Sequence, residues 1–258
     1  MKSVYFAFVF LLLTGCASGP RLDTSHPSAN HDNRVQFVVV HYTSANLERS
    51  LALLTHGQVS SHYLIGDDAS GTIYKLVDES QRAWHAGESE WMGRTWLNSS
   101  SIGIEIVNPG FRDTPTGRVW YPYSEAQVQS LEVLLKDIST RNGIDPKNII
   151  GHSDIAPLRK QDPGPLFPWK RLAEKGLGVW PDAQAVARYQ AQYATDLPSI
   201  TWFQEALAHL GYQTPQTGEL DVATRHVIAA FQMHFRPALF DGTPDAESAA
   251  ILRALDRR

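Results

Sequence analysis

The sequence predicts an α/β domain with a mixed central β-sheet flanked by helices, followed by a small C-terminal three-helix domain. Short runs of β-branched and apolar residues, typical of buried strands, recur up to residue 151. A long amphipathic helix separates two of these runs, as in folds where helices alternate with strands. After residue 198 only helical patterns remain, and 258 residues are enough for two domains.

The first predicted strand is the run Val-Gln-Phe-Val-Val-Val at residues 35–40. We expect a helix to begin after Ser124, because Gln127 stands three positions later, as in a capping box. Its apolar stripe ends at Asn142-Gly143, a common helix terminator. Further strands are predicted at residues 61–65, 72–77, 102–107 and 148–151.

The remaining helices follow from caps and apolar spacing. Pro168 is expected to begin a short helix, and residues 182–193 another. Near the C-terminus, a helix that starts around Ile200 should stop at Gly211, and Asp221 and Asp245 should cap two more. These last three helices form the predicted C-terminal domain.

The N-terminus has the pattern of an export signal. Lys2 precedes an apolar run at residues 4–13, which is too short to cross a bilayer permanently. The run ends in Leu13-Thr14-Gly15-Cys16, which resembles the lipobox of bacterial lipoproteins. That resemblance implies cleavage before Cys16, lipidation of Cys16 and, with Ala17 next, an anchor in the outer membrane of a Gram-negative bacterium, facing the periplasm. The alternative is an ordinary signal peptide with a chance cysteine.

The predicted organisation is therefore a signal peptide at residues 1–15, a flexible tether at 16–33, the α/β domain at 34–180, a linker or helix at 181–197 and the helical domain at 198–258. The net charge of −4 argues against a nucleic-acid partner, which requires a concentrated basic patch. The single cysteine excludes an intramolecular disulfide and a cysteine-based zinc site.

Three segments carry residues suited to metal chemistry. His41 ends the first predicted strand, Glu105 lies inside an apolar strand, and residues 151–165 carry His152, Lys160 and Asp162 on one irregular loop. Two imidazoles and one carboxylate suit Zn²⁺ and leave a fourth position for water. An apolar setting would raise the pKa of Glu105, so that it takes a proton from water, and Lys160 could donate to an oxyanion.

Each of these residues also has a purely structural interpretation. Most histidines in proteins are hydrogen-bonded structural or surface residues, and the chain has ten. Glu105 could be the exposed side of an alternating strand, and residues 162–165 could form only a turn. The sequence also lacks a close-range zinc signature such as His-Glu-x-x-His.

Over residues 35–176 the sequence resembles the zinc-dependent N-acetylmuramoyl-L-alanine amidases of the type-two family. The resemblance rests on His41-Tyr42-Thr43, Ser61-His62-Tyr63, His85-Ala86-Gly87, residues 101–105 and residues 151–165. It implies that His41, His152 and Asp162 bind one zinc ion, that Glu105 is the catalytic base and that Lys160 stabilises the oxyanion. His85 is interpreted as structural or substrate-facing, His62 as structural, and the other candidates for lining the cleft are Asn108, Arg159 and Trp169.

The implied reaction is hydrolysis of the amide between N-acetylmuramic acid and the L-alanine of the stem peptide, in peptidoglycan or its fragments. The C-terminal segment resembles a three-helix peptidoglycan-binding domain in residues such as Phe203-Gln204, Leu210-Gly211-Tyr212 and Asp241-Gly242-Thr243. It would then retain the enzyme on its polymer, or else serve only as a cap on the α/β domain. We expect a monomer.

Two other functions remain open at this stage. One is a lipoprotein that binds peptidoglycan, tethers the outer membrane to the wall and hydrolyses nothing. The other is a zinc amidase that acts on free peptides or proteins, because fold and chemistry do not fix the substrate.

Overall fold

The computed structural model describes residues 19–256 and divides the chain into two compact units, residues 1–32 and 33–258. In the first unit, residues 19–32 are exposed and contain neither helix nor strand. The predicted signal peptide and Cys16 lie outside the described residues. Within residues 19–256, no helix combines the length and the apolar character needed to cross a bilayer.

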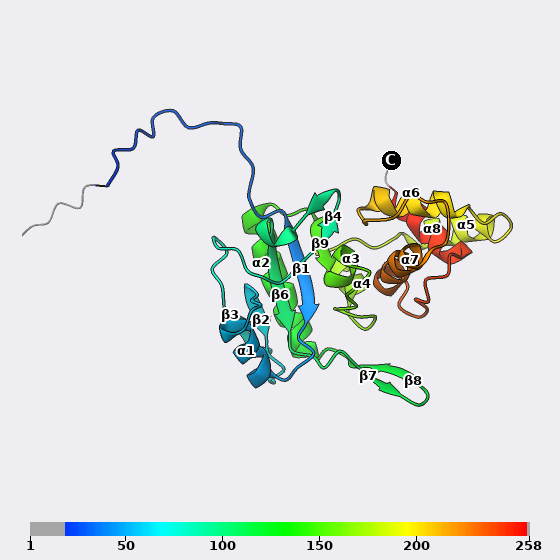
Figure 1. Ribbon diagram of the computed structural model, residues 1–258, viewed down its shortest axis with the longest axis horizontal. Coiled ribbons are helices and arrows are strands. Elements are labelled where there is room, and N and C mark those ends of the chain that lie inside the picture. Colours follow the sequence, from blue (N-terminus) through cyan, green and yellow to red (C-terminus); the bar gives the residue numbers. More distant parts are fainter. Residues whose placement is uncertain (1–18, 257–258) are drawn as a thin grey trace, which may run out of the picture. The chain divides into compact units, whose positions relative to one another are not determined.

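The second unit is built on a five-stranded mixed sheet, which confirms the predicted fold class (Figure 1). Across the sheet, the strands are in the order β3 (Ile73–Lys75), β2 (Tyr63–Ile65), β6 (Ser101–Ile106), β1 (Phe37–Tyr42) and β9 (Ile149–Gly151). β2, β6, β1 and β9 run parallel to one another. The edge strand β3 is antiparallel to β2.

The two faces of the sheet pack against different layers. Even-numbered residues of β1 and β6, such as Val38 and Ile104, contact the core formed with α2 (Glu125–Asn142). Odd-numbered residues of β1, Phe37 and Val39, belong to the core on the opposite face. Because side chains alternate along a strand, His41 and Glu105 project from that opposite face as well.

Local signals position α2 as the sequence predicts. Ser124 accepts a hydrogen bond from the backbone of Gln127, whose side chain accepts one from the Ser124 backbone. Gly143 ends the helix at φ 66°, a left-handed conformation that glycine adopts without strain. Leu131, Leu135 and Ile138 are fully buried against the sheet.

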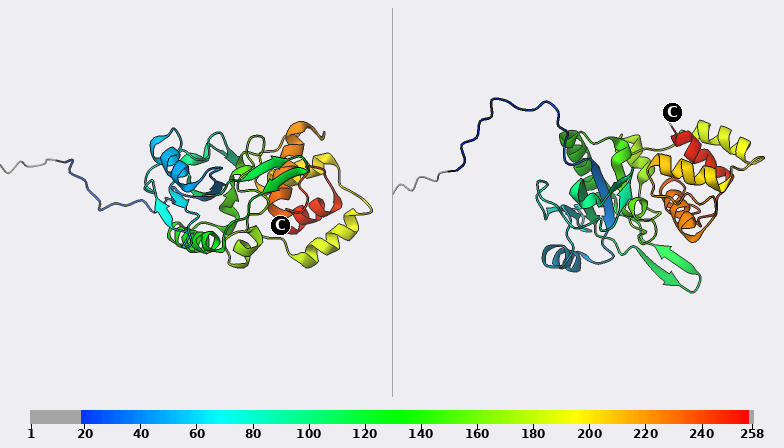
Figure 2. Two further views of the ribbon diagram at one scale, coloured as in Figure 1. Left: turned by 90° about the horizontal axis from the view of Figure 1, so that it is seen from below. Right: turned by 45° about the horizontal axis from the view of Figure 1, so that its top comes forward.

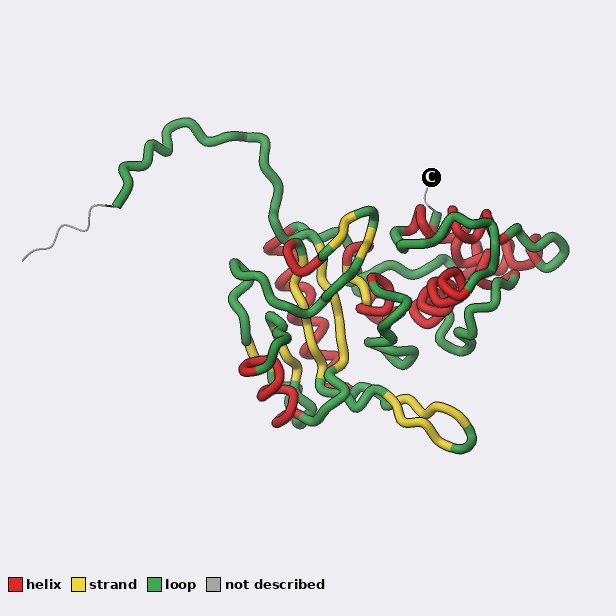
Figure 3. The backbone as a smooth tube through the Cα atoms, viewed as in Figure 1, coloured by secondary structure: helices red, strands yellow, loops and turns green. Residues whose placement is uncertain are grey.

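Several short elements have no counterpart in the sequence prediction. They are α1 (Leu47–His56), α3 (His152–Ile155), the hairpin of β4 (Glu90–Trp91) and β5 (Arg94–Thr95), and the hairpin of β7 (Phe111–Thr114) and β8 (Gly117–Trp120), which projects from the sheet in Figure 3. The predicted short helix after Pro168 is α4 (Trp169–Glu174). The loop expected at residues 151–165 is partly helical, because α3 occupies its beginning.

Four helices gather in the C-terminal part (Figure 2). Asp182, Ser199, Asp221 and Asp245 cap them, and their bounds are α5 (Ala183–Tyr193), α6 (Ile200–Leu210), α7 (Val222–Phe235) and α8 (Ala246–Leu255). α5 lies against α8, and its Val186 and Tyr193 pack on the core that contains Phe203 and Phe231. Residues 181–197, expected to be a linker or a helix, thus contain α5, which packs with the other three helices.

This helical module docks on α3 through a buried carboxylate. The Tyr212 hydroxyl donates to Oδ1 of Asp154 at 2.7 Å, and Nδ1 of His234 lies 2.8 Å from Oδ2. The Gly151 backbone N–H donates to the same Oδ2 at 2.8 Å. Asp154 has no exposed surface, and buried carboxylates of this kind are retained only when their lone pairs have donors.

Replacing Tyr212 by phenylalanine should weaken this contact between the module and α3. The variant leaves Oδ1 of buried Asp154 without its hydroxyl donor, which costs about 1–3 kcal/mol in the free energy of unfolding. Urea denaturation measures the change. Tyr189→Phe, on α5, is the control that should leave stability unchanged; an equal loss in both variants would contradict the assigned contact.

A second cluster ties the loop before β4 to α2. Both terminal guanidinium nitrogens of Arg141 donate to the Glu79 carboxylate at 2.9 Å, and the Tyr63 hydroxyl donates to it at 2.5 Å. The hydrogen bonds from Arg141 outweigh the effect of burial and lower the pKa of Glu79 to about 2. The loop held in this way leads directly into His85.

Glu79 should make the folded protein sensitive to acid. Its folded-state pKa lies below the ordinary value of 4.5, so its contribution is present above about pH 4.5 and is lost as the pH falls toward 2. Urea midpoints measured across that range should fall more steeply for the wild type than for Glu79→Gln. The exposed Glu174→Gln variant serves as the control, and identical slopes for wild type and Glu79→Gln would contradict the prediction.

Candidate metal centre and active site

Three ligand-type atoms meet where β1 and β9 end. β1 and β9 are paired at Val40 and Gly151, so His41 and His152 follow at the same edge of the sheet. Their Nδ1 atoms are 2.8 Å apart, and Oδ2 of Asp162 lies 3.1 Å from the first and 2.9 Å from the second. All three residues are buried. The structure thus brings together the three predicted ligands from distant parts of the chain.

The spacing and the charges fit one divalent cation. Atoms that share a tetrahedral zinc ion at bond lengths near 2.0 Å are about 3.3 Å apart, close to the distances observed here. Burial and the neighbouring His152 lower the pKa of His41 to about 4, so this imidazole is neutral near pH 7. Burial raises the pKa of Asp162, but His152 and His41 outweigh it and hold that pKa well below its usual range. Neutral imidazole and ionised carboxylate are the forms that bind metal.

Glu105 supplies a carboxyl group beside these ligands. It is the residue of β6 in register with His41 of β1. Its Oε2 atom is buried and has no hydrogen-bond partner among the described residues. Burial, reinforced by Asp162 and opposed by Lys160, raises its pKa to about 8. A carboxyl group with a pKa near the working pH is suited to accept and return a proton.

Lys160 provides a positive charge at the same site. Burial has the larger effect on the pKa of His41, which it lowers, and on that of Glu105, which it raises. The charge of Lys160 lowers both pKa values, because its ammonium group lies near both side chains. Lys160 is half-buried, and its ammonium group makes no hydrogen bond or ion pair within the described part of the chain. It is therefore free to donate to an oxygen atom of a bound molecule.

Backbone hydrogen bonds fix the loop that carries Lys160 and Asp162. The Lys160 N–H donates to the Ala156 carbonyl at 3.0 Å, and the Ser153 N–H donates to the Asp162 carbonyl at 2.8 Å. The Tyr123 hydroxyl donates to the Pro163 carbonyl at 2.8 Å. The long loop is thus anchored to α3 at one end and to the segment before α2 at the other.

Two residues expected to line the cleft make contacts within the fold. The Asn108 amide donates to the carbonyls of Tyr121 and Pro122 and accepts from the Gly110 N–H, so both of its donor hydrogens hold a loop. Trp169 is buried, and its ring stacks on His234 of the helical module with centroids 3.9 Å apart. A contact of either residue with a substrate stays a prediction.

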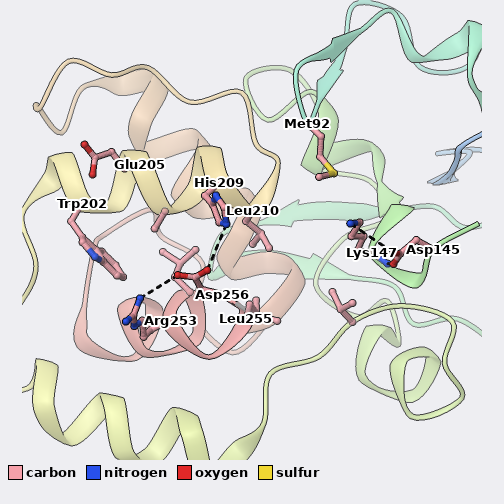
Figure 4. Close-up of a pocket in the computed structure, with 13 residues that line it drawn as sticks. Met92, Asp145, Lys147, Trp202, Glu205, His209, Leu210, Arg253, Leu255 and Asp256 are labelled. Atoms are coloured by element: carbon pink, nitrogen blue, oxygen red, sulfur yellow. Dashed lines mark hydrogen bonds and ion pairs between the residues drawn. The ribbon is translucent and has the colours of Figure 1, made fainter. Parts of the chain in front are cut away.

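Arg159 lies beside the centre. Its guanidinium donates to the carbonyls of Ala86 and Glu88, and the residue lines a cavity of about 500 Å³ with Trp96 and Leu158. Its predicted role as a substrate contact stays a prediction. A larger cavity of about 710 Å³ contains none of the candidate catalytic residues; Figure 4 shows it lined by Trp202, His209 and Arg253.

Sequence reasoning missed several residues around the ligands. Ser101 and Gly103 lie on the same side of β6 as Glu105; alternation along the predicted strand would have found Gly103, whereas Ser101 lies one residue before the predicted start. The Asn98 side chain comes from a short 3-10 helix, Leu97–Ser99, and the Ala86 carbonyl from a loop, and no periodicity marks either segment. His62 is structural as expected, since its Nδ1 accepts from the Gly103 N–H at 3.0 Å.

Removing one of the three ligands should abolish tight binding of a divalent cation. We expect Asp162→Ala to lower the affinity for Zn²⁺ by more than the roughly 10–100-fold that loss of an outer-shell partner costs. Chelator competition measures the affinity. The exposed Asp67→Ala variant should bind as the wild type does, and an Asp162→Ala protein with wild-type affinity would refute the site.

Two family models match the chain. The first, described as N-acetylmuramoyl-L-alanine amidase, matches residues 31–165. The second, described as "Putative peptidoglycan binding domain", matches residues 196–252. They cover the α/β part and most of the C-terminal helices, respectively.

Relatives and solved structures agree with these matches. N-acetylmuramoyl-L-alanine amidase AmiD of Escherichia coli is 45% identical over 264 residues, which cover 95% of this chain and 94% of that protein. The structure of E. coli AmiD in complex with anhydro-N-acetylmuramic acid-L-Ala-D-gamma-Glu-L-Lys superposes with a TM-score of 0.84 at 44% identity, covering 92% of this chain and 94% of the other. AmpDh3 of Pseudomonas aeruginosa, in complex with anhydromuramic pentapeptide, gives 0.86 at 41% identity, covering 92% and 97%.

A more distant relative matches a smaller region. The 1,6-anhydro-N-acetylmuramyl-L-alanine amidase AmpD of Citrobacter freundii is 40% identical over 127 residues, which cover 49% of this chain and 62% of that protein. With a buried His-His-Asp cluster and near full-length similarity to AmiD, the chain belongs to the N-acetylmuramoyl-L-alanine amidase family of metal-dependent enzymes.

Proposed function

We propose that the protein hydrolyses the amide bond between N-acetylmuramic acid and the L-alanine of the stem peptide, in peptidoglycan or its fragments, with one zinc ion held by His41, His152 and Asp162. The convergence of these three side chains beside Glu105 is the observation that carries the proposal. The solved structures of E. coli AmiD and P. aeruginosa AmpDh3 are complexes with anhydromuramic peptides, which supports this substrate class.

The choice of zinc rests on the donor set. Two imidazole nitrogens and one carboxylate oxygen form a three-ligand set typical of catalytic zinc sites, in which a fourth position stays open. Bound there, a zinc ion supplies Lewis acidity and lowers the pKa of water in its coordination sphere. With a single negative charge among the ligands, the occupied site keeps a net positive charge.

Glu105 and Lys160 would carry out the proton and charge steps. Glu105 takes a proton from the attacking water and returns it to the nitrogen of the departing L-alanine. Lys160 donates to the carbonyl oxygen as negative charge develops on it, an interaction that is stronger in the transition state than in the ground state. Its ammonium has no hydrogen-bond partner within the described residues that would compete for this role.

The alternatives account less well for the site. A protein that only binds peptidoglycan has no need for an unpaired buried carboxyl oxygen and a free ammonium next to three ligand atoms. An amidase for free peptides requires the same catalytic groups, but the match of residues 196–252 to a peptidoglycan-binding family favours the wall polymer. Because ligands and base come from one chain, a monomer suffices.

The cellular setting is also a proposal. We propose that Cys16 carries a lipid that anchors the chain in the outer membrane, with residues 17–33 as a tether into the periplasm. The helical module would hold the enzyme on the wall through a second weak contact, which raises the effective concentration of cleavable bonds. The lipobox residues and the family match of the module support this arrangement.

Substituting Glu105 by glutamine tests the catalytic assignment. The variant should bind zinc as tightly as the wild type but lose about 10²–10⁴-fold in kcat, because the proton acceptor is gone while the ligands remain. The measurement is release of free stem peptide from a defined anhydromuropeptide, followed by mass spectrometry. Glu219→Gln, exposed on the helical module, is the matched control.

The outcomes separate the proposals. Release of stem peptide by the wild type only when zinc is present supports the reaction and the metal together. Full activity of Glu105→Gln would overturn the base assignment, and no release by zinc-loaded wild type would overturn the proposed function.

A further inference from the structure

A third buried histidine, His85, contacts the candidate metal centre but has no role in the chemistry described above. Its Nδ1 atom lies 3.0 Å from Nε2 of His41, and the two rings meet edge to face at 83°. His85 is 8% exposed, and its Nε2 lies 3.1 Å from the Ser101 hydroxyl. Both ring nitrogens therefore have partners inside the protein, which leaves none for a substrate.

The hydrogen bonds from Ser101 through His85 to His41 form a series, and the bond that Ser101 makes to the Leu97 carbonyl determines the direction of the others. The Ser101 hydroxyl donates its single proton to the Leu97 carbonyl at 2.7 Å, so it must accept from Nε2–H of His85. His85 is buried and has no hydrogen bond to an acidic side chain within the described residues, so the neutral ring carries only that one proton. Its Nδ1 is then an acceptor and takes the proton of His41 Nε2–H. The lone pair of His41 Nδ1 faces His152 and Asp162.

The neighbouring residue acts in the same way on the second histidine ligand. The Ala86 carbonyl lies 3.1 Å from Nε2 of His152, and a carbonyl oxygen can only accept. His152 is therefore protonated at Nε2, and its Nδ1 lone pair also faces the other ligand atoms. Adjacent residues thus determine the tautomer of both histidines, one through its side chain and the other through its backbone.

We propose that the segment His85–Ala86 is a positioning element that presets both histidine ligands, His41 and His152, with Nδ1 lone pairs facing the metal. This inference rests on the proposed metal function and extends it to residues outside the ligand set. Outer partners of this kind orient ligating histidines and strengthen metal binding.

The surrounding structure is arranged to hold this segment in place. Oδ1 of buried Asn98 accepts from the backbone N–H groups of His85 and Ala86 at 3.0 and 2.7 Å. A Cβ at Gly103 would lie 2.4 Å from Cγ of His85, so only glycine at that position of β6 leaves room for the ring. Along one face of β6, Ser101 orients His85, Gly103 accommodates it, and Glu105 reaches the site.

Two substitutions of His85 distinguish positioning from simple packing. Asparagine places an amide oxygen near the former Nδ1 and can still accept from His41, whereas leucine fills the space without an acceptor. We expect His85→Leu to weaken Zn²⁺ binding about 10–100-fold and His85→Asn to recover most of that loss. Chelator competition on the purified full chain gives the dissociation constants.

Histidine ¹⁵N NMR spectra of the metal-free chain provide a readout other than binding. In the wild type and in His85→Asn, His41 should be protonated at Nε2 alone. In His85→Leu, its signals should shift toward a mixture of the two tautomers. Val107→Ala, in a separate core cluster with Leu54 and Leu64, is the control that should lower stability without changing the tautomer or the zinc affinity.

The zinc affinities of the two His85 variants test the positioning role. Wild-type affinity in His85→Leu, or equal losses in the leucine and asparagine variants, would overturn the positioning role. If wild-type protein bound no zinc, the proposed metal function would fail; the NMR tautomer of His41 would still reveal whether the hydrogen-bond chain exists.

Discussion

The parallel, in-register pairing of β1 with β6 and β9 is the constraint on which the site depends. It sets His41 opposite Glu105 and places His152 one residue beyond the pair formed by Val40 and Gly151. Parallel strands bring their carboxyl ends to one edge of the sheet, where catalytic groups of α/β proteins commonly gather. A shift of one residue in either pairing would turn a ligand or the base to the face covered by α2.

Because side chains alternate along a strand, the core residues packed against α2 and the candidate site residues lie on opposite faces of β1 and β6. One side of β1 and β6 is apolar and buried against α2, while the other carries His41, Ser101, Gly103 and Glu105. The C-terminal module packs against this second side. Its Tyr212 and His234 bind Asp154, which lies two residues after His152. The module is therefore attached to the short helix that begins with a candidate ligand, as well as matching a peptidoglycan-binding family.

Much of the framework was predictable, because long apolar runs and capping residues act locally. The five strands of the main sheet, the α2 capping box and the caps at Asp221 and Asp245 were all predicted. The β4–β5 hairpin was not, since its strands have two residues each and the Met92 N–H bonds to Gly211 from the far module. Similarly, the tertiary partners of Asn108 and Trp169, which are the 121–122 backbone and His234, leave no local signal in the sequence. The three predicted ligands did converge: His41 and His152 lie at predicted strand ends, and the loop after His152 turns back so that Asp162 joins them.

The proposed function requires one zinc ion bound by Nδ1 of His41, Nδ1 of His152 and the carboxylate of Asp162. Anomalous diffraction at the zinc absorption edge, from crystals of the zinc-loaded protein, tests it most directly. We expect a single strong peak within bonding distance of those three atoms, near Glu105 and Lys160. A peak held by other residues, or none at this position in fully loaded protein, would contradict it.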